Sequence, residues 1–231
     1  EKVIEKGDIS TNISFSIKSG EKVAIIGASG SGKTTISQLI AGFYAKNSGD
    51  ILYNDISIDN ISKKSLREHL FLVLQMPILF NNTLRFNLTM GENISNEKIK
   101  EALKIAQLNS MLENLPDGLD TIVGKMGIRL SGGQRQRLSI ARMILANPSV
   151  VIFDESTSAL DVQTETKLFE NLENILKDKT VITIAHRLST VKNASKIFVL
   201  EDGELVQSGT HMELEDEIGH YKEFVKHQLL N

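Results

Sequence analysis

The sequence lacks cysteine altogether, so neither a disulfide nor a thiolate metal site can form in its 231 residues. That absence is compatible with the cytosol. No apolar run approaches the roughly 18 residues that suggest a membrane span, and residues 1–6 do not have the pattern of a signal peptide. We therefore expect any membrane connection to come from another chain or from a part of the protein outside this sequence.

Strong charge of either sign is also missing. The formal net charge is −3, which gives no electrostatic reason to expect nucleic acid or an anionic membrane surface as a direct partner. Only three prolines interrupt the chain, and it contains no repeats, low-complexity tracts or obvious linkers. Its 41% of hydrophobic and 24% of charged residues are those of an ordinary soluble globular protein, long enough for one large domain or two small ones.

What the sequence does contain is a glycine-rich loop of the form G-x-x-x-x-G-K-[ST], the phosphate-binding loop. It consists of Gly27, Ala28, Ser29, Gly30, Ser31, Gly32, Lys33 and Thr34. The apolar run 23–26 predicts a buried strand before it, and apolar residues at helical spacing over 36–43 predict a helix after it. This context favours a phosphate site over a glycine-rich turn that matches by chance.

The composition of this loop has a physical reason. Its glycines let the backbone bend around a phosphate chain, so that successive N–H groups converge on the phosphate oxygens. The N-terminus of the following helix adds a favourable field for negative charge. We expect Lys33 to reach the β- and γ-phosphates of a nucleotide, and the Thr34 hydroxyl to ligand Mg²⁺.

Further strands are predicted near the phosphate loop. Apolar and polar residues alternate over 13–17, which predicts a half-buried strand. The runs 49–53 and 56–58 predict an antiparallel hairpin beside the main parallel sheet. After a short polar helix, the apolar run 71–74 ends at Gln75.

The pattern becomes predominantly helical from residue 77 to about 129. Ile99, Ala102, Leu103 and Ala106 have the spacing of one helix face. We expect this stretch to be a helical insertion between strands of the parallel sheet.

A second helix start follows the insertion, in the sequence Leu130-Ser131-Gly132-Gly133-Gln134. Ser131 and Gln134 have capping-box spacing, and apolar residues recur after them at helical spacing. A well-capped helix would explain these two residues but not two adjacent glycines, each unfavourable in a helix. Because bare glycines suit the close approach of an anion to exposed N–H groups, we expect a second phosphate-binding helix start here.

Two acidic residues end the next predicted strand, the apolar run 150–153. Ligands bind at the carboxyl ends of strands in open parallel sheets, and neighbouring residues on an extended backbone point in different directions. Asp154 therefore suits Mg²⁺, directly or through water, and Glu155 is placed to orient or deprotonate an attacking water. A solvated acidic strand end is the alternative. The strand predicted over 181–185 ends at His186, which we expect to contact the γ-phosphate although a lone histidine is more often structural.

The C-terminal part of the chain continues these patterns. Apolar residues over 168–176 predict an amphipathic helix. The runs 197–200 and 204–206 flank Asp202-Gly203 and predict a hairpin. The segment from Met212 onward predicts surface helices.

The motifs occur in the order seen in ATP-binding cassette (ABC) transporters: the phosphate loop, Gln75, the run 130–134, the strand 150–155, the run 158–161 and His186. The chain resembles a nucleotide-binding domain of that family over essentially its whole length. The pentapeptide 130–134, the signature of the family, is highly specific when it occurs together with the phosphate loop. The runs 153–161 and 185–191 most resemble the exporter branch.

The resemblance implies an α/β fold with a P-loop NTPase core. The core has a mainly parallel sheet, and it carries an N-terminal antiparallel β subdomain and a helical subdomain. The chain would be one ABC domain, with the ATP-binding core at about 1–75 and 140–231 and the helical subdomain, which ends in the signature, at about 76–139.

The resemblance also implies ATP and Mg²⁺ as cofactors, and a second copy of the chain as partner in a head-to-tail dimer. Each ATP would lie between the phosphate loop of one copy and the signature of the other, with Asp161 connecting the two sites. Nucleotide-binding residues would be Gly27, Ala28, Ser29, Gly30, Ser31, Gly32, Lys33, Thr34, Thr35, Ser131, Gly132, Gly133, Gln134 and Asp161. Catalytic residues would be Lys33, Gln75, Glu155 and His186, and the metal would be held by Thr34, Gln75 and Asp154.

Two positions depart from the family pattern. Family members usually carry an aromatic residue upstream of the phosphate loop that stacks on adenine, and no aromatic residue precedes Phe15. We assign Phe15 to a strand of the core instead. Exporters often have an acidic residue just before the signature, where Lys125 follows Gly124 here. This difference bears on the contact with the membrane domain.

The function implied is that of the ATP-hydrolysing motor of an exporter, on the cytoplasmic side of a membrane. It would be tethered through a transmembrane domain that usually precedes it in the same polypeptide. One alternative is the separate ATPase subunit of an importer. Another is a non-transport member of the family, but such proteins insert a long coiled coil or carry two cassettes, and the single compact cassette here shows neither.

Overall fold

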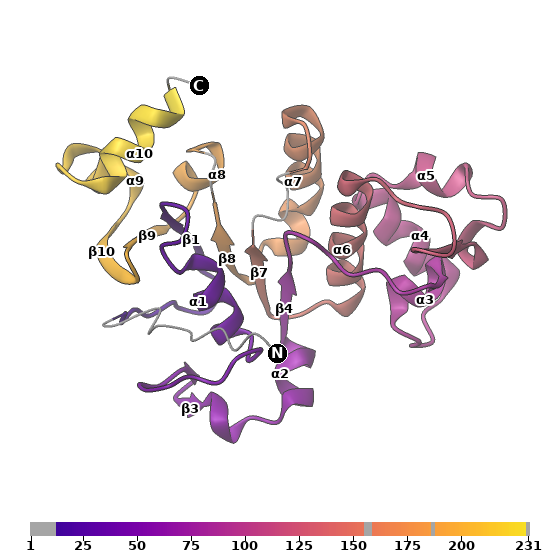
Figure 1. The fold of residues 1–231 in the computed structure, drawn as a ribbon, viewed down its shortest axis with the longest axis horizontal. Coiled ribbons are helices and arrows are strands. Elements are labelled where there is room, and N and C mark those ends of the chain that lie inside the picture. The colour runs from indigo at the N-terminus through magenta and orange to yellow at the C-terminus, as the bar shows by residue number, and fades with distance from the viewer. Residues whose placement is uncertain (1–12, 155–158, 186–187, 230–231) are drawn as a thin grey trace, which may run out of the picture.

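A mixed sheet of six strands forms the centre of the computed structural model, which describes residues 13–154, 159–185 and 188–229. The strand order is β10-β9-β1-β8-β7-β4, and all neighbours are parallel except β9 and β10 (Figure 1). The strands are β1 (Lys22–Gly27), β4 (Leu70–Val73), β7 (Val150–Asp154), β8 (Thr180–Ile184), β9 (Lys196–Glu201) and β10 (Glu204–Gly209). The predicted mainly parallel α/β sheet is therefore confirmed.

Alternation of side chains along each strand gives the sheet two buried faces. In β1, Val23 and Ile25 pack on the face that is covered by α1 (Lys33–Ile40), whereas Ala24 and Ile26 pack on the opposite face. All four residues are at most 2% exposed. The continuous apolar run before the phosphate loop thus reflects a strand that is covered on both sides.

The face opposite α1 is covered by two long helices and by the C-terminal helices. These are α6 (Gly132–Ala146), α7 (Val162–Leu176), α8 (Leu188–Lys192), α9 (His211–Asp216) and α10 (His220–Leu229). Leu214, Tyr221 and Val225 are no more than 5% exposed and pack against Ile26 and Val199 of the sheet. The prediction of surface helices after Met212 therefore missed a buried face, although Tyr221 and Val225 are one helical turn apart and could have indicated it.

The N-terminal segment does not form the strand that its alternation predicts. Ile13, Phe15 and Ile17 are partly buried against the sheet, but residues 13–18 have no strand pairing in the part of the chain that the structure describes. The rings of Phe15 and Phe198 lie 4.7 Å apart, centroid to centroid. The alternation thus indicated which side chains face the core, and the prediction of a strand was wrong because alternation alone does not supply a partner ladder.

The predicted hairpin between residues 49 and 58 is present and small. It pairs β2 (Leu52–Tyr53) with β3 (Ile56–Ser57) in an antiparallel arrangement. Asn54 and Asp55 form its two-residue turn, and both have the positive φ that such a turn requires. The elements that follow are a 3₁₀ helix, η1 (Ile58–Asn60), and α2 (Lys63–His69).

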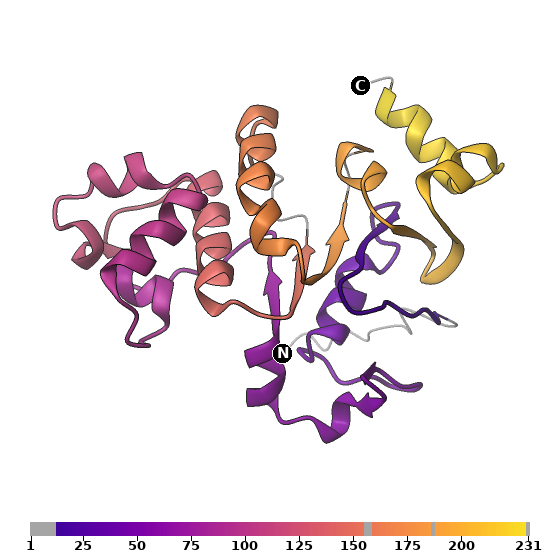
Figure 2. The ribbon, with the colours of Figure 1, turned by 180° about the vertical axis from the view of Figure 1, so that it is seen from behind.

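A helical region lies beyond α6, on the side away from β9 and β10, as Figures 1 and 2 both show. It contains β5 (Asn82–Thr83), α3 (Leu84–Thr89), α4 (Asn96–Ile105), α5 (Asn109–Glu113), η2 (Gly118–Asp120) and β6 (Ile122–Val123). Its own core includes the predicted helix face of α4, whose four apolar residues are at most 1% exposed. The small antiparallel pair β5–β6 was not predicted, since two residues per strand leave no periodic pattern.

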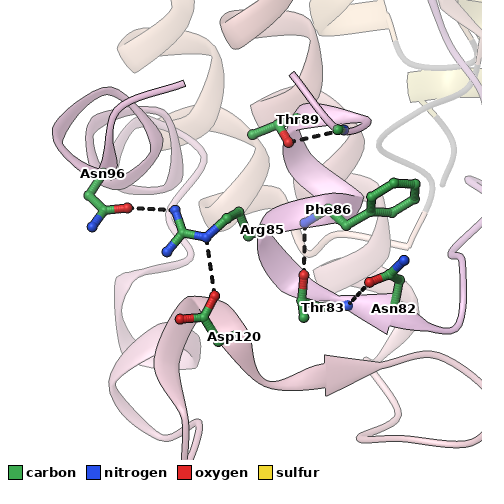
Figure 3. Close-up of polar contacts among 8 residues, drawn as sticks. Asn82, Thr83, Arg85, Phe86, Thr89, Asn96 and Asp120 are labelled. Atoms are coloured by element: carbon green, nitrogen blue, oxygen red, sulfur yellow. Dashed lines mark hydrogen bonds and ion pairs between the residues drawn. The ribbon is translucent and has the colours of Figure 1, made fainter. Parts of the chain in front are cut away.

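Polar contacts fix the entry to this helical region (Figure 3). Thr83 caps α3 by accepting a hydrogen bond from the Phe86 N–H at 3.0 Å. The Arg85 guanidinium donates to Asp120 at 3.1 Å and also to Asn96, so it joins α3 to η2 and to the start of α4. The region is therefore held together by its own polar contacts as well as by its own apolar core.

Helix α6 belongs to both units. Leu138 and Ala141 face the core of the helical region, whereas Ile140 and Met143 face the core next to β7. The division of the chain at about residue 140 falls inside this helix and stays a prediction. A shift of α6 must therefore act on both the sheet and the helical region.

Candidate active site

Part of the positions predicted from the sequence lies at one edge of the sheet. Strands β1, β8, β7 and β4 are adjacent and parallel, so their carboxyl ends meet there. Gly27 ends β1, Asp154 ends β7, and Gln75 follows β4 by two residues. Glu155 and His186 lie outside the described residues. This edge is where open parallel sheets bind ligands.

The phosphate loop runs from the end of β1 into α1. Gly30 and Gly32 have φ values of 85° and 96°, which residues with a side chain rarely adopt. A Cβ on Gly27 would lie 2.2 Å from the carbonyl oxygen of Leu200, so that position has no room for a side chain. Residues 28–30 are exposed, and α1 has no side-chain hydrogen bond at its N-cap, Gly32. The loop therefore presents backbone rather than side chains at the start of α1.

Lys33 is folded against its own loop. Its side chain is buried, and Nζ donates to the carbonyl oxygens of Gly27 at 2.9 Å and Ala28 at 2.7 Å. It also lies 3.4 Å from the Ser31 hydroxyl. These neutral acceptors stabilise the ammonium group inside the curl of the loop. A phosphate oxygen is a stronger acceptor for this donor because both groups are then charged.

Asp154 reaches from the end of β7 to the first turn of α1. It is 2% exposed, and its Oδ1 accepts from the Thr34 hydroxyl at 3.3 Å. The hydroxyl of Ser37 lies 3.2 Å from Asp154 Oδ2 and 2.8 Å from the carbonyl oxygen of Thr34. Ser37 was not predicted as part of the site, although its position one turn after Thr34 could have indicated it.

The hydroxyl oxygen of Thr34 and the carboxylate oxygen of Asp154 suit Mg²⁺. That ion takes oxygen ligands at near-octahedral geometry and is usually bound through one or two carboxylates together with phosphates and waters. Thr34 and Asp154 supply a hydroxyl and a carboxylate within hydrogen-bond distance of each other. Within residues 13–154, 159–185 and 188–229, no three or more His, Cys, Asp or Glu side chains gather as a metal site. One hydroxyl and one carboxylate therefore fit a Mg²⁺ ion whose other ligands are phosphates and waters.

The second predicted helix start has a complete capping box. The Ser131 hydroxyl accepts from the Gln134 N–H at 3.2 Å, and the Gln134 side chain accepts from the Ser131 N–H at 2.8 Å. A Cβ on Gly133 would lie 3.1 Å from the Leu160 side chain and 3.4 Å from the Ala159 carbonyl oxygen. Close packing against residues 159–160 is thus a further reason for this glycine, and the sequence alone gave no sign of it.

The two helix starts do not face a common point within one chain. Figures 1 and 2 show α1 and α6 on opposite sides of β7 and β4. The structure thus brings Lys33, Thr34 and Asp154 together, and it places Ser131, Gly132, Gly133 and Gln134 elsewhere. Thr35 is partly buried in the first turn of α1.

Asp161 caps α7. Its carboxylate accepts from the Thr164 N–H at 2.9 Å and from the Thr164 hydroxyl at 2.6 Å. The bonds from the Thr164 side chain and backbone lower the pKa of Asp161 below its ordinary value. The residue is exposed, so its charged carboxylate remains open to solvent while it holds the start of α7.

Two buried polar residues of α6 were not predicted. Gln136 bonds the backbone of Gln75 and of Ala159. Arg142 donates to the Ile78 carbonyl oxygen at 2.9 Å, and to both the carbonyl and the side chain of Asn87. Burial lowers the pKa of Arg142 to about 10. Bonds to backbone carbonyls leave no motif in a sequence, which is why neither residue could be found from it.

A groove of about 720 Å³ opens between α2, β4, α3 and α6, away from the phosphate loop. Its lining includes Arg67, Phe71, Leu74, Phe80 and Met90. Phe80 and Met90 are each 48% exposed, which is high for such large apolar side chains. None of the helices in the part of the chain that the structure describes is both long and apolar enough to span a bilayer.

A family model described as "ABC transporter" matches residues 10–158. The chain belongs to the ABC transporter family. An ATP-dependent lipid A-core flippase of Chromobacterium violaceum is 46% identical to this ABC chain over 212 residues, 91% of this chain and 36% of the relative. A putative multidrug export ATP-binding/permease protein of Staphylococcus aureus is also 46% identical over 212 residues, 91% of this chain and 37% of the relative.

A solved structure agrees with these relatives. The structure of a bacterial Atm1-family ABC exporter with ATP bound superposes on this ABC chain with a TM-score of 0.89 and 39% identity, covering 95% of this chain and 39% of that chain. The chain thus spans less than two fifths of the length of these three proteins. It is an exporter-type ATPase domain, and neither the importer subunit nor the non-transport protein is favoured as an alternative.

Proposed function

We propose that this domain binds ATP with Mg²⁺ between two copies of itself, hydrolyses it, and thereby drives transport by a membrane domain. The observation that carries the proposal is the junction of α1 and β7, where Lys33, Thr34 and Asp154 meet at the carboxyl edge of the sheet. A flexible cationic donor, a hydroxyl and a carboxylate at a glycine-rich helix start are the groups that a magnesium nucleotide requires.

The phosphate chain of ATP would lie against the backbone of residues 27–35. The Lys33 ammonium would move from the carbonyl oxygens of Gly27 and Ala28 to the phosphate oxygens, because these are charged acceptors. Thr34, Asp154 and Gln75 would hold Mg²⁺, which neutralises developing charge on the phosphates. The Gly27 position, closed to any side chain by Leu200, keeps the backbone near the ligand.

Glu155 would orient or deprotonate the attacking water, since it follows Asp154 directly at the strand end. His186, next after Ala185 beyond β8, would contact the γ-phosphate. Positioning and electrostatic stabilisation dominate phosphoryl transfer, so Lys33 together with these residues would supply most of the rate enhancement.

A second copy would complete each site. Because α1 and α6 lie on opposite sides of β7 and β4, the glycine-rich start of α6 suits a nucleotide held by another molecule. Ser131, Gly132, Gly133 and Gln134 would contribute N–H groups and a hydroxyl to the γ-phosphate of the partner copy. Asp161, at the exposed start of α7, would link the two sites across the interface.

The membrane domain would dock in the groove beside α2 and α3, on the cytoplasmic side of the membrane. The groove has exposed apolar side chains beside charged residues of both signs, Lys64 and Arg67 with Glu68 and Glu92, and it is formed partly by the segment that follows Gln75. A helix of the membrane domain with an apolar face bordered by charged residues matches this lining. The membrane domain would precede this chain in the same polypeptide, as the lengths of the relatives allow.

The variant Glu155→Gln tests the catalytic assignment. It keeps the shape of the side chain and removes the base, so ATP binding should be retained, turnover should be lost, and a dimer should accumulate in ATP and Mg²⁺. Equilibrium ATP binding, phosphate release and size-exclusion chromatography measure these three effects. Glu170→Gln, an exposed glutamate on α7, is the matched control and should behave like the wild type. Wild-type turnover in Glu155→Gln would remove Glu155 from its role.

A further inference from the structure

Gln136 lies on α6 five residues after the helix cap Ser131, and it is 3% exposed. Its side chain donates one hydrogen bond and accepts another, to two different segments of the described chain. Nε2 donates to the carbonyl oxygen of Gln75 at 3.2 Å, and Oε1 accepts from the backbone N–H of Ala159 at 3.1 Å. A carboxamide is the neutral side chain that can both donate and accept across such a short span.

The two partners of Gln136 belong to different segments of the site. Gln75 follows β4, and Ala159 lies two residues before the α7 cap Asp161. Both segments leave the carboxyl edge of the sheet, where the nucleotide is proposed to bind. The Gln136 side chain therefore binds the backbone of Gln75, a predicted catalytic residue. It also binds the backbone of Ala159, close to Asp161, which is the predicted link between the two sites.

Independent packing ties the same face of α6 to the Ala159 segment. Gly133, one turn before Gln136, leaves room for Leu160 and for the Ala159 carbonyl. Ile140, one turn after Gln136, packs with Leu160 in the core next to β7. Residues at these spacings share one side of a helix, so the contact with residues 159–160 continues along two turns of α6.

The Gln75 segment is likewise held to α6 at a second point. Arg142 donates to the Ile78 carbonyl oxygen, three residues after Gln75, and it also binds the Asn87 carbonyl in α3. The segment thus has two anchors on one rigid helix, Gln136 at its beginning and Arg142 further along. A displacement of α6 cannot leave the Gln75 backbone where it was unless these buried bonds break, which is costly.

We infer that Gln136 is a positioning residue that couples the two nucleotide sites, by moving the Gln75 and Ala159 segments together with the signature helix. When the start of α6 engages the nucleotide held by the partner copy, Gln136 carries that shift to Gln75 in its own site and toward Asp161. This inference rests on the proposed function, because it assigns Gln136 to the communication between the two sites of that dimer.

The test compares Gln136→Met with the wild-type 231-residue chain. Methionine keeps the length of the side chain and removes both hydrogen bonds. Affinity for ATP at protein concentrations too low for dimerisation should stay within about twofold, since the phosphate loop is untouched, while kcat should fall about tenfold as a coupling bond is lost. The cooperativity of hydrolysis with ATP concentration should disappear. Asn171→Ala, which removes a bond from α7 to the Ile105 carbonyl in α4, is the control and should keep both kcat and cooperativity.

A second variant keeps the test valid if Gln136→Met does not fold. In Gln136→Glu the carboxylate still accepts from Ala159 but cannot donate to Gln75 until it is protonated. Burial raises the pKa of a carboxyl group, so the kcat of this variant, relative to wild type, should rise as the pH is lowered from about 8 to about 6. A purely structural Gln136 would give no such recovery.

The outcomes separate the inference from the proposed function. The coupling role is supported if the wild type hydrolyses ATP cooperatively, Gln136→Met does not, and the kcat of Gln136→Glu recovers at low pH. Wild-type cooperativity that persists in both variants overturns it and leaves the nucleotide-bound dimer standing. If neither the wild type nor the Glu155→Gln variant forms a dimer in ATP and Mg²⁺, the proposed function is overturned, and the coupling role with it.

Discussion

Two helix starts in this chain are rich in glycine, and they are built in opposite ways. Helix α1 begins after Gly32, a residue with positive φ, without a side-chain hydrogen bond at its cap. Helix α6 begins after Ser131 with both bonds of a capping box in place. The first N–H groups of a helix have no partner within the helix. At α1 no side chain at the cap accepts a hydrogen bond from these N–H groups, so they can bind another acceptor. At α6 the capping box already satisfies two of them.

The difference suits the proposal that a nucleotide binds first at α1 of one copy and is then engaged by α6 of the other. The start of α1 has Lys33 and Asp154 beside it in the same chain, so it suits a nucleotide that binds first to a single copy. The start of α6 is satisfied on its own and is joined by Gly133 and Gln136 to residues 159–160. The start of α6 is therefore stable without a ligand. A ligand that engaged it would change these contacts, which extend to the rest of the site.

Removing the cation at the first start should have the largest effect. Lys33→Ala deletes the charged donor that is proposed to reach the phosphates, so we expect hydrolysis to fall by at least about 100-fold together with weaker ATP binding. Phosphate release and equilibrium binding of ATP measure these losses. Lys46→Ala is the control, because Lys46 forms a surface ion pair with Asp59 and such pairs contribute little. Equal behaviour of the two variants would show that α1 is not the first site.

Removing the cap at the second start should have a smaller and more selective effect. Ser131→Ala should lower the free energy of unfolding by about 1 kcal/mol and reduce hydrolysis several-fold, while the affinity of a single copy for ATP stays unchanged. Urea unfolding, phosphate release and ATP binding separate these quantities. Ser95→Ala removes the corresponding cap of α4, where no nucleotide is expected, so it should cost stability without changing hydrolysis. If both variants lost hydrolysis equally, stability alone would explain the effect and the two helix starts would not differ in function.

The same contrast shows which parts of the molecule could be predicted from the sequence. The phosphate loop, its strand and its helix are encoded within about twenty consecutive residues, so local periodicity and spacing were sufficient. The segment 13–17 shows the limit, since alternation specifies which side chains face the core and not whether a strand partner exists. Gln136 and Arg142 could not be found, because both bind backbone carbonyls or N–H groups from distant segments, whose identity leaves no trace in the sequence. Tyr221 was missed although Phe224 and Val225 follow it at helical spacing, which could have indicated a buried face.

A third helix start offers the finest comparison, with the smallest expected effect. Helix α9 has the same kind of capping box as α6, with Glu213 in place of glutamine. The Thr210 N–H and then the Thr210 hydroxyl donate to the Glu213 carboxylate, and these bonds lower the pKa of Glu213 below its ordinary value. A carboxyl group with a lowered pKa in the folded state stabilises the fold above its unfolded pKa, and that stabilisation is lost as the pH falls through the folded value. The wild type should therefore be slightly more resistant to urea than Glu213→Gln at about pH 7, and the difference should vanish as the pH falls below about 4.5.

Glu223→Gln, in the first turn of α10, controls for the effect of a negative charge near a helix start without a box. A difference between wild type and Glu213→Gln that stayed constant with pH would mean that the box at α9 works through shape alone. The neutral box at α6 would then have no advantage in being insensitive to pH.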